Sequence, residues 1–238
     1  MLHPFSIFPL GDSALVVELG TDMDEMTSRR TLRLFRQLQR HVIPGVRNLV
    51  PAYTSLSVFF DPVQIKRNGS REGTAFEQVA AWIESLPLDA PEEEHESRLL
   101  IPVCYDGAFG PDLEDLASVA GLPKEEVIRL HTAASYRVYM IGFLPGFPYL
   151  GEVDPRIAMP RKETPRLNVS AGSVGIAGRQ TGIYPFDSPG GWQIIGRTPL
   201  ALFDADKESP ALLSPGMTVE FYSITPDEFA HYQSRAAR

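Results

Sequence analysis

Cysteine is nearly absent from this 238-residue sequence, in which Cys104 is the single example. One thiol cannot form an internal disulfide and is too few for a thiolate metal site. The five histidines are scattered and none is paired at positions i and i+4, so the sequence predicts no zinc site. These absences favour a protein of the reducing cytoplasm that holds no metal.

Positive charge is in deficit, with 22 Lys and Arg against 30 Asp and Glu and a formal net charge of −8. Such a surface repels nucleic-acid phosphates and anionic lipids, so we expect neither nucleic acid nor a membrane as partner. The opening MLHPFSIFPLGD lacks the basic region and the apolar run of a signal peptide. No later stretch approaches the ~20 apolar residues of a membrane span.

Several nucleotide, nucleophile and cofactor motifs are also missing. The sequence contains no Gly-Lys pair and therefore no Walker A phosphate loop, so an ATP site here would be of another kind. Residues 171–175 approach a nucleophile elbow but carry Ala171 where the first glycine belongs. The four lysines do not lie between methionines, so no biotin-accepting sequence is present.

Residues 1–90 alternate between strand and helix patterns. Gly11-Asp12 is a turn pair that predicts a hairpin, and apolar residues at steps of three and four predict two amphipathic helices. The expected elements are strands at 5–9 and 14–19, a helix at 24–42, strands at 46–50 and 55–60, a helix at 74–86 and a closing strand at 99–103. This order predicts an α+β domain on the ferredoxin-like plan.

A charged segment at residues 91–97 interrupts these patterns. It begins with Pro91 and contains the run Glu92-Glu93-Glu94-His95-Glu96. Charge-dense stretches with proline are typical of solvated linkers, so we place a domain boundary here. The alternative is a charged loop inside one domain.

Residues 98–238 predict a second, β-rich domain. Asp112 is a candidate N-cap of a first helix that ends at Gly121, and Pro123 lies in the first turn of a second helix. After His131, glycines and prolines recur every few residues between short apolar pieces. This spacing is typical of a closed or partly closed β-barrel with long loops.

The barrel segment combines residue types that suit a cleft for a small anionic substrate. Gly190-Gly191 after Pro189 permits close approach of a ligand or a second chain. Aromatic side chains form a candidate apolar wall and arginines form candidate anion-binding forks; these are Phe143, Phe147, Tyr149, Tyr184, Trp192, Arg161, Arg166, Arg179 and Arg197. Each residue alone also has an ordinary reading, because any barrel needs corner glycines, core aromatics and exposed arginines.

Four sequence motifs in this segment, taken together, resemble a known family. They are GFLPGFPYLG, PRKETPR, GSVGIAGRQTGIYP and SPGGWQIIGRTP. The set is similar to the signature of the KipI family, also called allophanate hydrolase subunit 1, and the resemblance extends from about Phe5 to Phe221. It implies an N-terminal α/β domain followed by a cyclophilin-like β-barrel.

The resemblance also implies an activity and partners. Members similar to this chain form part of an ATP-dependent 5-oxoprolinase, which hydrolyses 5-oxo-L-proline to L-glutamate. They act with a KipA-like protein and a LamB/YcsF-like protein, so we expect negligible activity from this chain alone. ATP is then a co-substrate, and its site can lie on one of these partners.

The motifs and the resemblance together indicate candidate site residues. His131 matches a family position and is a candidate general acid or base, with a capping or core histidine at a helix C-terminus as the alternative. The substrate-binding or interface candidates are Phe147, Tyr149, Arg161, Arg166, Gln180, Tyr184, Ser188, Gly190, Gly191, Trp192 and Arg197.

Two rival functions stay open at the level of sequence. One is a KipI-type inhibitor that binds a sensor histidine kinase, and the other is a carboxyltransferase component of a urea carboxylase or allophanate system. The cyclophilin-like label also raises prolyl isomerase activity, but a shared fold does not transfer chemistry.

Overall fold

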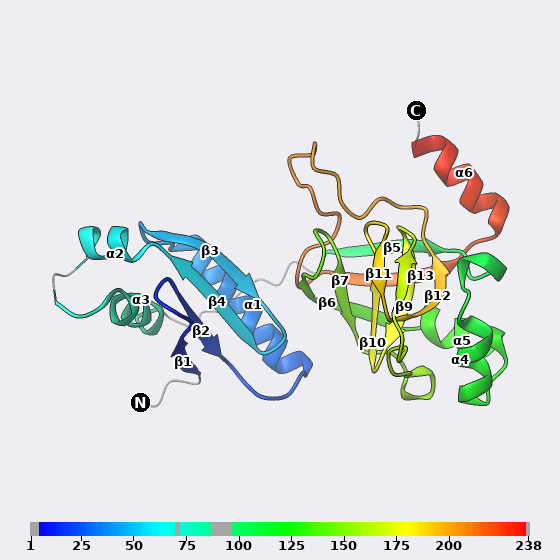
Figure 1. The fold of residues 1–238 in the computed structure, drawn as a ribbon, viewed down its shortest axis with the longest axis horizontal. Coiled ribbons are helices and arrows are strands. Elements are labelled where there is room, and N and C mark those ends of the chain that lie inside the picture. The colour runs from blue at the N-terminus through cyan, green and yellow to red at the C-terminus, as the bar shows by residue number, and fades with distance from the viewer. Residues whose placement is uncertain (1–4, 70–71, 87–96, 237–238) are drawn as a thin grey trace. The chain divides into compact units, whose positions relative to one another are not determined.

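The structure, a computed structural model, describes residues 5–69, 72–86 and 97–236 of the chain (Figure 1). Its contacts divide the chain into two compact units, residues 1–95 and residues 96–238. The predicted linker at 91–97 falls almost wholly outside the described residues, so this boundary stays a prediction.

Unit 1 is built on a four-stranded antiparallel sheet in the order β1-β2-β4-β3. Its elements are β1 (Ser6–Pro9), β2 (Ala14–Glu18), α1 (Glu25–Arg40), β3 (Val46–Pro51), β4 (Ser55–Phe60), α2 (Pro62–Asn68) and α3 (Ala75–Glu84). Strand and helix side chains share one apolar core, which includes Leu15, Val17, Leu34, Leu38, Leu56, Val58, Val79 and Ile83. The helices predicted at 24–42 and 74–86 are therefore confirmed.

Side-chain caps explain where the helices of unit 1 begin. Asp24 accepts a hydrogen bond from the backbone N–H of Thr27 at 2.7 Å, and Thr74 forms a capping box with Glu77 at the start of α3. Helix α2 is absent from the elements expected from the sequence, because Asp61-Pro62 follows a strand and is also a typical strand end. Asp61 instead caps α2, with Pro62 at the first helical position.

The strand at 99–103 does not close the sheet of unit 1, and this prediction was wrong. The hairpin at Gly11 places β1 beside β2, with Phe8 opposite Val16, so that edge of the sheet is already occupied. The strand itself, β5 (Arg98–Val103), pairs in parallel with β13 (Thr218–Ser223) in unit 2.

Unit 2 is built on a seven-stranded sheet in the order β12-β9-β10-β7-β6-β13-β5. The other strands are β6 (Ser135–Ile141), β7 (Pro148–Gly151), β9 (Ser173–Ala177), β10 (Gln180–Ile183) and β12 (Gln193–Arg197). The sheet curls until its two ends meet at Cys104 and Arg197, which exchange backbone hydrogen bonds of 2.8 and 2.9 Å. The predicted barrel is thus present as a nearly closed sheet.

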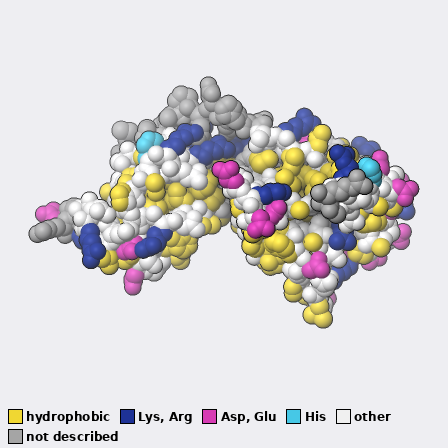
Figure 2. Space-filling view, turned by 90° about the horizontal axis from the view of Figure 1, so that it is seen from above, with side chains coloured by type: hydrophobic (Ala, Val, Ile, Leu, Met, Phe, Trp, Pro, Cys, Tyr) yellow, Lys and Arg dark blue, Asp and Glu magenta, His cyan; other side chains and the backbone are white. Residues whose placement is uncertain are grey.

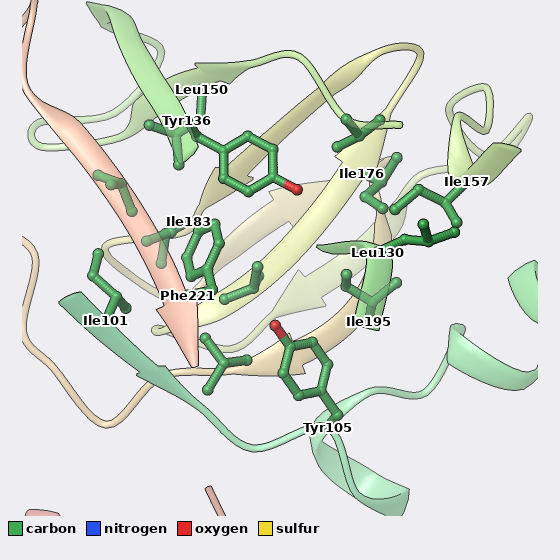
Figure 3. Close-up of a cluster of buried hydrophobic side chains, with 14 of the residues drawn as sticks. Ile101, Tyr105, Leu130, Tyr136, Leu150, Ile157, Ile176, Ile183, Ile195 and Phe221 are labelled. Atoms are coloured by element: carbon green, nitrogen blue, oxygen red, sulfur yellow. The ribbon is translucent and has the colours of Figure 1, made fainter. Parts of the chain in front are cut away.

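Apolar side chains fill the inside of this curled sheet. Figure 3 shows Tyr136, Leu150, Ile176, Ile183 and Phe221 turned toward one another from different strands, and all five are buried. A second, two-stranded sheet pairs β8 (Arg166–Val169) with β11 (Ser188–Gly190).

Short helices connect and flank the strands of unit 2. They are η1 (Gly107–Phe109), α4 (Leu113–Ala120), α5 (Lys124–Thr132), η2 (Pro155–Ile157) and α6 (Pro226–Ala236). Helix α4 ends at Gly121, whose φ of 65° is the left-handed conformation that favours glycine. In the described part of the chain, no helix is long and apolar enough to cross a membrane.

Candidate functional site

An open cavity of about 270 Å³ lies in unit 2 between the curled sheet and the loops that precede β7 and β12. Its lining is mainly aromatic and basic, and consists of Phe143, Phe147, Tyr149, Arg161, Lys162, Pro165, Tyr184, Pro189, Gly190, Gly191 and Trp192. Seven of the predicted site residues are in this set: Phe147, Tyr149, Arg161, Tyr184, Gly190, Gly191 and Trp192. The structure therefore gathers most of the predicted cleft.

Phe147 is the centre of the aromatic wall. Its ring lies edge-on to those of Tyr149, Tyr184 and Trp192, with centroid separations of 4.9, 5.2 and 5.4 Å. Edge-to-face packing at these distances is the favourable geometry for aromatic pairs. Because Phe147 and Trp192 are buried, the wall is a packed, preformed surface.

Two strand glycines make room for Trp192. A Cβ atom at Gly182 of β10 would lie 2.9 Å from the Trp192 ring, and one at Gly175 of β9 would lie 3.0 Å from the Trp192 Cβ. Real side chains do not tolerate such approaches without movement. The central strands of the sheet thus carry glycine where the indole packs against them.

The loop before β7 brings a strained residue to the cavity. Phe143 has a φ of 68°, the one described non-glycine residue in the left-handed region, and its side chain is 63% exposed. Tight backbone hydrogen bonds from Leu144 to Gly142 and from Phe147 to Leu144 hold this turn. Such conformations persist where the surrounding structure imposes them, and they cluster at functional sites.

Asp112 organises two cations beside the cavity. One carboxylate oxygen lies 2.8 Å from Nζ of Lys162 and 2.5 Å from Nη2 of Arg166, while the other accepts the backbone N–H of Ile194 at 2.7 Å. Burial raises the pKa of Asp112, but the hydrogen bonds from Arg166, Lys162 and Ile194 outweigh burial and the net pKa is lowered. Asp112 is therefore a buried, ionised carboxylate.

Sequence reasoning missed this role of Asp112. Asp112 does precede α4, as predicted for an N-cap, but its side chain makes no capping hydrogen bond. The carboxylate turns instead to β12, where the backbone N–H of Asp112 also donates to Ile194 O at 2.9 Å. No local signal could reveal this, because Arg166 and Ile194 are 54 and 82 residues away in the chain.

Arg161 is the exposed cation of the cavity lining, and the described residues form no ion pair with it. Burial raises the pKa of Tyr149, and the positive charge of Arg161 opposes the rise. Burial likewise raises the pKa of Tyr184, opposed by a backbone hydrogen bond from Trp192 and by the charge of Arg161. The guanidinium is thus electrostatically coupled to two hydroxyl groups of the wall.

His131 is placed away from the cavity, in the core of unit 2. Its ring is fully buried and stacks on Phe221 at 4.6 Å, while Nδ1 lies 2.8 Å from the Tyr105 hydroxyl and Nε2 3.0 Å from the Thr181 hydroxyl. Thr181 donates its own proton to Gly175 O, so Nε2 carries the hydrogen that Thr181 accepts. Burial lowers the pKa of His131 to about 3, which keeps the ring neutral.

The remaining predicted residues lie outside the cavity lining. Gln180 pairs with Gly151 and Ala177 in the sheet, and the Nε of Arg197 donates to Ala171 O at 2.7 Å. Ser188 is buried in β11, and its hydroxyl forms no hydrogen bond within the described residues. Arg166 reaches the site through Asp112, whereas Arg179 pairs with Glu152 at the surface.

Charge elsewhere on the surface is mixed. On the face shown in Figure 2, basic and acidic side chains of the described residues are interspersed. No group of three or more His, Cys, Asp or Glu residues in the described ranges is arranged to hold a metal ion.

Comparisons with known proteins agree with this architecture. The family described as carboxyltransferase domain, subdomain C and D, matches residues 5–213. The B subunit of 5-oxoprolinase from Bacillus subtilis (strain 168) is 42% identical over 235 residues, which is 98% of each chain. Its counterpart of the same name from Escherichia coli O157:H7 is 40% identical over 213 residues, 89% of this chain and 93% of that one.

A solved structure shares the fold. The crystal structure of TTHA0988 matches with a TM-score of 0.77 at 39% identity, over 89% of this chain. This chain spans only 40% of that solved chain.

Proposed function

This chain belongs to the carboxyltransferase-domain family, subdomain C and D, and from that premise we propose that it is the B subunit of an ATP-dependent 5-oxoprolinase. The family predicted from the motifs is confirmed. The observation that carries the proposal is identity of 40% or more, over nearly the whole chain, to curated proteins that bear this name. The aromatic and cationic cavity supports it, because 5-oxo-L-proline is a small ring compound with one carboxylate.

The reaction requires energy that hydrolysis of ATP supplies. Transfer of the γ-phosphoryl group from ATP to the lactam oxygen releases ADP and makes the ring carbon electrophilic. One water adds to this carbon, and the C–N bond breaks as the nitrogen takes a proton, which leaves an acyl phosphate. A second water then hydrolyses the acyl phosphate to phosphate and the new carboxylate of L-glutamate. The cavity of about 270 Å³ lies below the ~300 Å³ at which typical ligand pockets begin. We therefore place the small ring substrate in this cavity and the ATP on a partner protein.

A B subunit works together with other subunits, so this chain requires partner proteins. We propose that a KipA-like protein and a LamB/YcsF-like protein complete the enzyme, and that this chain has negligible activity alone. ATP as co-substrate supports a cytoplasmic location. None of the predicted residues Gln180, Ser188 and Arg197 lines the cavity. The half-buried Gln180 and Arg197 stay candidates for contact with a partner, whereas Ser188 is buried within unit 2.

The finer fold is also a proposal. The order β1-β2-β4-β3 is the ferredoxin-like order, with the N-terminal β1 in the place of the usual last strand. We propose that unit 1 is this variant of the ferredoxin-like plan and that unit 2 is a cyclophilin-like barrel.

Reconstitution tests the function directly. This chain is mixed with candidate KipA-like and LamB/YcsF-like proteins, each is omitted in turn, and release of phosphate and glutamate that depends on 5-oxoproline is measured. We expect turnover only from the complete mixture. Robust turnover without this chain would contradict the assignment, and robust turnover by this chain alone would contradict the need for partners.

The same purified proteins also test the two rival functions. If the complex assembles but does not act on 5-oxoproline, carboxyl transfer from biotin is assayed next, since the family description names a carboxyltransferase domain. Inhibition of autophosphorylation of a sensor histidine kinase by this chain would support the binding-protein reading.

A further inference from the structure

Of the cations at the cavity, Lys162 and Arg166 are paired with a carboxylate, whereas Arg161 has no ion pair within the described residues. This difference indicates the chemistry of the ligand that the cavity binds. Resting on the function proposed above, we propose that the cavity binds small ring compounds through a carboxylate held by Arg161, and that Asp112 is a positioning residue that keeps Lys162 and Arg166 out of that contact. The ring lies against the wall formed by Phe147, Tyr149 and Trp192.

Asp112 separates the three cations into two classes. Its buried carboxylate binds Lys162 and Arg166 through the same oxygen, at 2.8 and 2.5 Å, so both charges have a fixed partner. Arg161 lines the cavity and has no ion pair within the described residues. Its planar fork of donors can therefore take a carboxylate in two parallel hydrogen bonds.

Arg161 also lies where a ligand in the cavity would meet it. Its charge acts on the hydroxyl groups of both Tyr149, in β7, and Tyr184, which directly follows β10. A ring that covers Trp192 can thus direct a substituent toward the guanidinium. The cavity volume of about 270 Å³ suits a single ring with its substituents.

The charge balance predicts which ligands are rejected. Three cations and one carboxylate leave an excess of two positive charges in this cluster. A ligand ammonium group is repelled there, while a lactam nitrogen is neutral. The cavity therefore distinguishes 5-oxo-L-proline from L-proline, whose ammonium group is repelled.

Fluorescence of Trp192 reports binding without any enzyme activity. The sequence has two tryptophans, so Trp82→Phe leaves Trp192 as the sole indole in the full-length chain. The probes are 5-oxo-L-proline, cyclopentanecarboxylate, 2-pyrrolidinone and L-proline. We expect the first two to change the emission at lower concentrations than the neutral lactam or the amino acid, by about tenfold to a hundredfold.

Variants identify the residue that takes the carboxylate. Arg161→Gln should weaken binding of both carboxylates by about tenfold to a hundredfold and leave that of 2-pyrrolidinone unchanged. Arg161→Lys should restore part of the loss. Arg179→Gln removes an exposed arginine outside the cavity and serves as the matched control.

The positioning role of Asp112 is tested by the ligand preference of a variant. Asp112→Asn keeps an acceptor for Ile194 but releases Lys162 and Arg166, so L-glutamate and other dicarboxylates should bind more tightly and the preference for one carboxylate should fall. A variant with unchanged ligand preference would overturn the role of Asp112.

The outcomes separate this proposal from the function. If Trp192 responds to no probe, or if 2-pyrrolidinone binds as tightly as 5-oxo-L-proline, the cavity assignment is overturned even when the reconstituted complex is active. If ring carboxylates bind through Arg161 but the complex shows no 5-oxoproline-dependent turnover, the cavity chemistry stands and the proposed function fails.

Discussion

Single residues in this protein serve the fold and the site at once, and Asp112 is the main example. Its backbone and carboxylate both bind Ile194, so it continues the hydrogen-bond ladder beyond the edge of β12. The same carboxylate holds Lys162 and Arg166. A buried charge is tolerated here because every one of these partners neutralises or hydrogen-bonds it.

Replacement of Asp112 should therefore reduce stability in a graded manner. Asp112→Ala leaves two cations and a buried N–H without partners and should lower the free energy of unfolding by about 3–5 kcal/mol. Asp112→Asn keeps one acceptor and should cost about 1–3 kcal/mol. Urea unfolding followed by circular dichroism measures both, and equal losses for the two variants would contradict this account.

His131 makes the stability of unit 2 depend on pH. Its pKa is about 3 in the folded protein against an ordinary value of 6.5, so between these values the unfolded chain binds a proton that the folded chain does not. The part of the free energy of unfolding that depends on neutral His131 is fully present above pH ~6.5. As the pH falls toward ~3, this part decreases by up to about 5 kcal/mol.

Comparison with His131→Asn isolates this effect. The variant should be less stable at neutral pH and should show a shallower decline in unfolding free energy from neutral pH to about pH 5. If the unfolding free energies of the wild-type chain and the variant fall in parallel with pH, groups other than His131 cause the pH dependence. If His131 acts instead as a general base, reconstituted enzyme with the variant should lose turnover far beyond its loss of folded protein.

At the scale of elements, β9 and β10 form the floor on which the aromatic wall rests. Both strands are buried along most of their length, and their glycines face the indole of Trp192. The loops before β7 and β12 then supply the rings of Phe147 and Trp192. A rigid floor with irregular loops above it is a common way to fix a binding surface.

Gly182→Ala should therefore disturb the wall. The new methyl group would lie 2.9 Å from both the Trp192 ring and Pro148 O and 3.0 Å from the Phe147 ring, and overpacking of this kind costs about 1–3 kcal/mol. Gly191→Ala is the matched control for stability, because its Cβ would meet nothing closer than 3.7 Å. Thermal unfolding and Trp192 emission measure the change, and identical behaviour of the two variants would contradict the packing role of Gly182.

At the scale of the whole molecule, the candidate site belongs to one unit. The cavity lining extends from Phe143 to Trp192 and the supporting Asp112 lies in the same unit. Unit 2 also has an extensive apolar core of its own.

A fragment of residues 97–238 should keep the ligand response. We expect it to fold cooperatively and to bind ring carboxylates within about threefold of the full chain, since all the described residues that line the cavity lie in unit 2. Fluorescence titration and circular dichroism test this. A folded fragment that no longer binds would show that unit 1 contributes to the site.

Local sequence determined much of this protein. Hairpin and amphipathic patterns predict most elements of unit 1, and the motif set between residues 142 and 199 contains the cavity lining, because these features depend on neighbours in the chain. Helix α2 was missed because its cap at Asp61 also suits a strand end, and β5 was predicted in the wrong sheet because its partner β13 lies more than a hundred residues away.

Only the tertiary structure decided how the charges and rings are used. Arginines, an aspartate and a histidine of ordinary appearance in the sequence acquire different roles through contacts across 50 residues or more, such as Arg166 with Asp112 and His131 with Thr181. Burial and pairing then keep Asp112 ionised and His131 neutral, and Arg161 is left without an ion pair among the described residues. The sequence determines which groups are available, while folding determines which of them are neutralised, because electrostatic pairing depends on distance and desolvation in space and not on order along the chain.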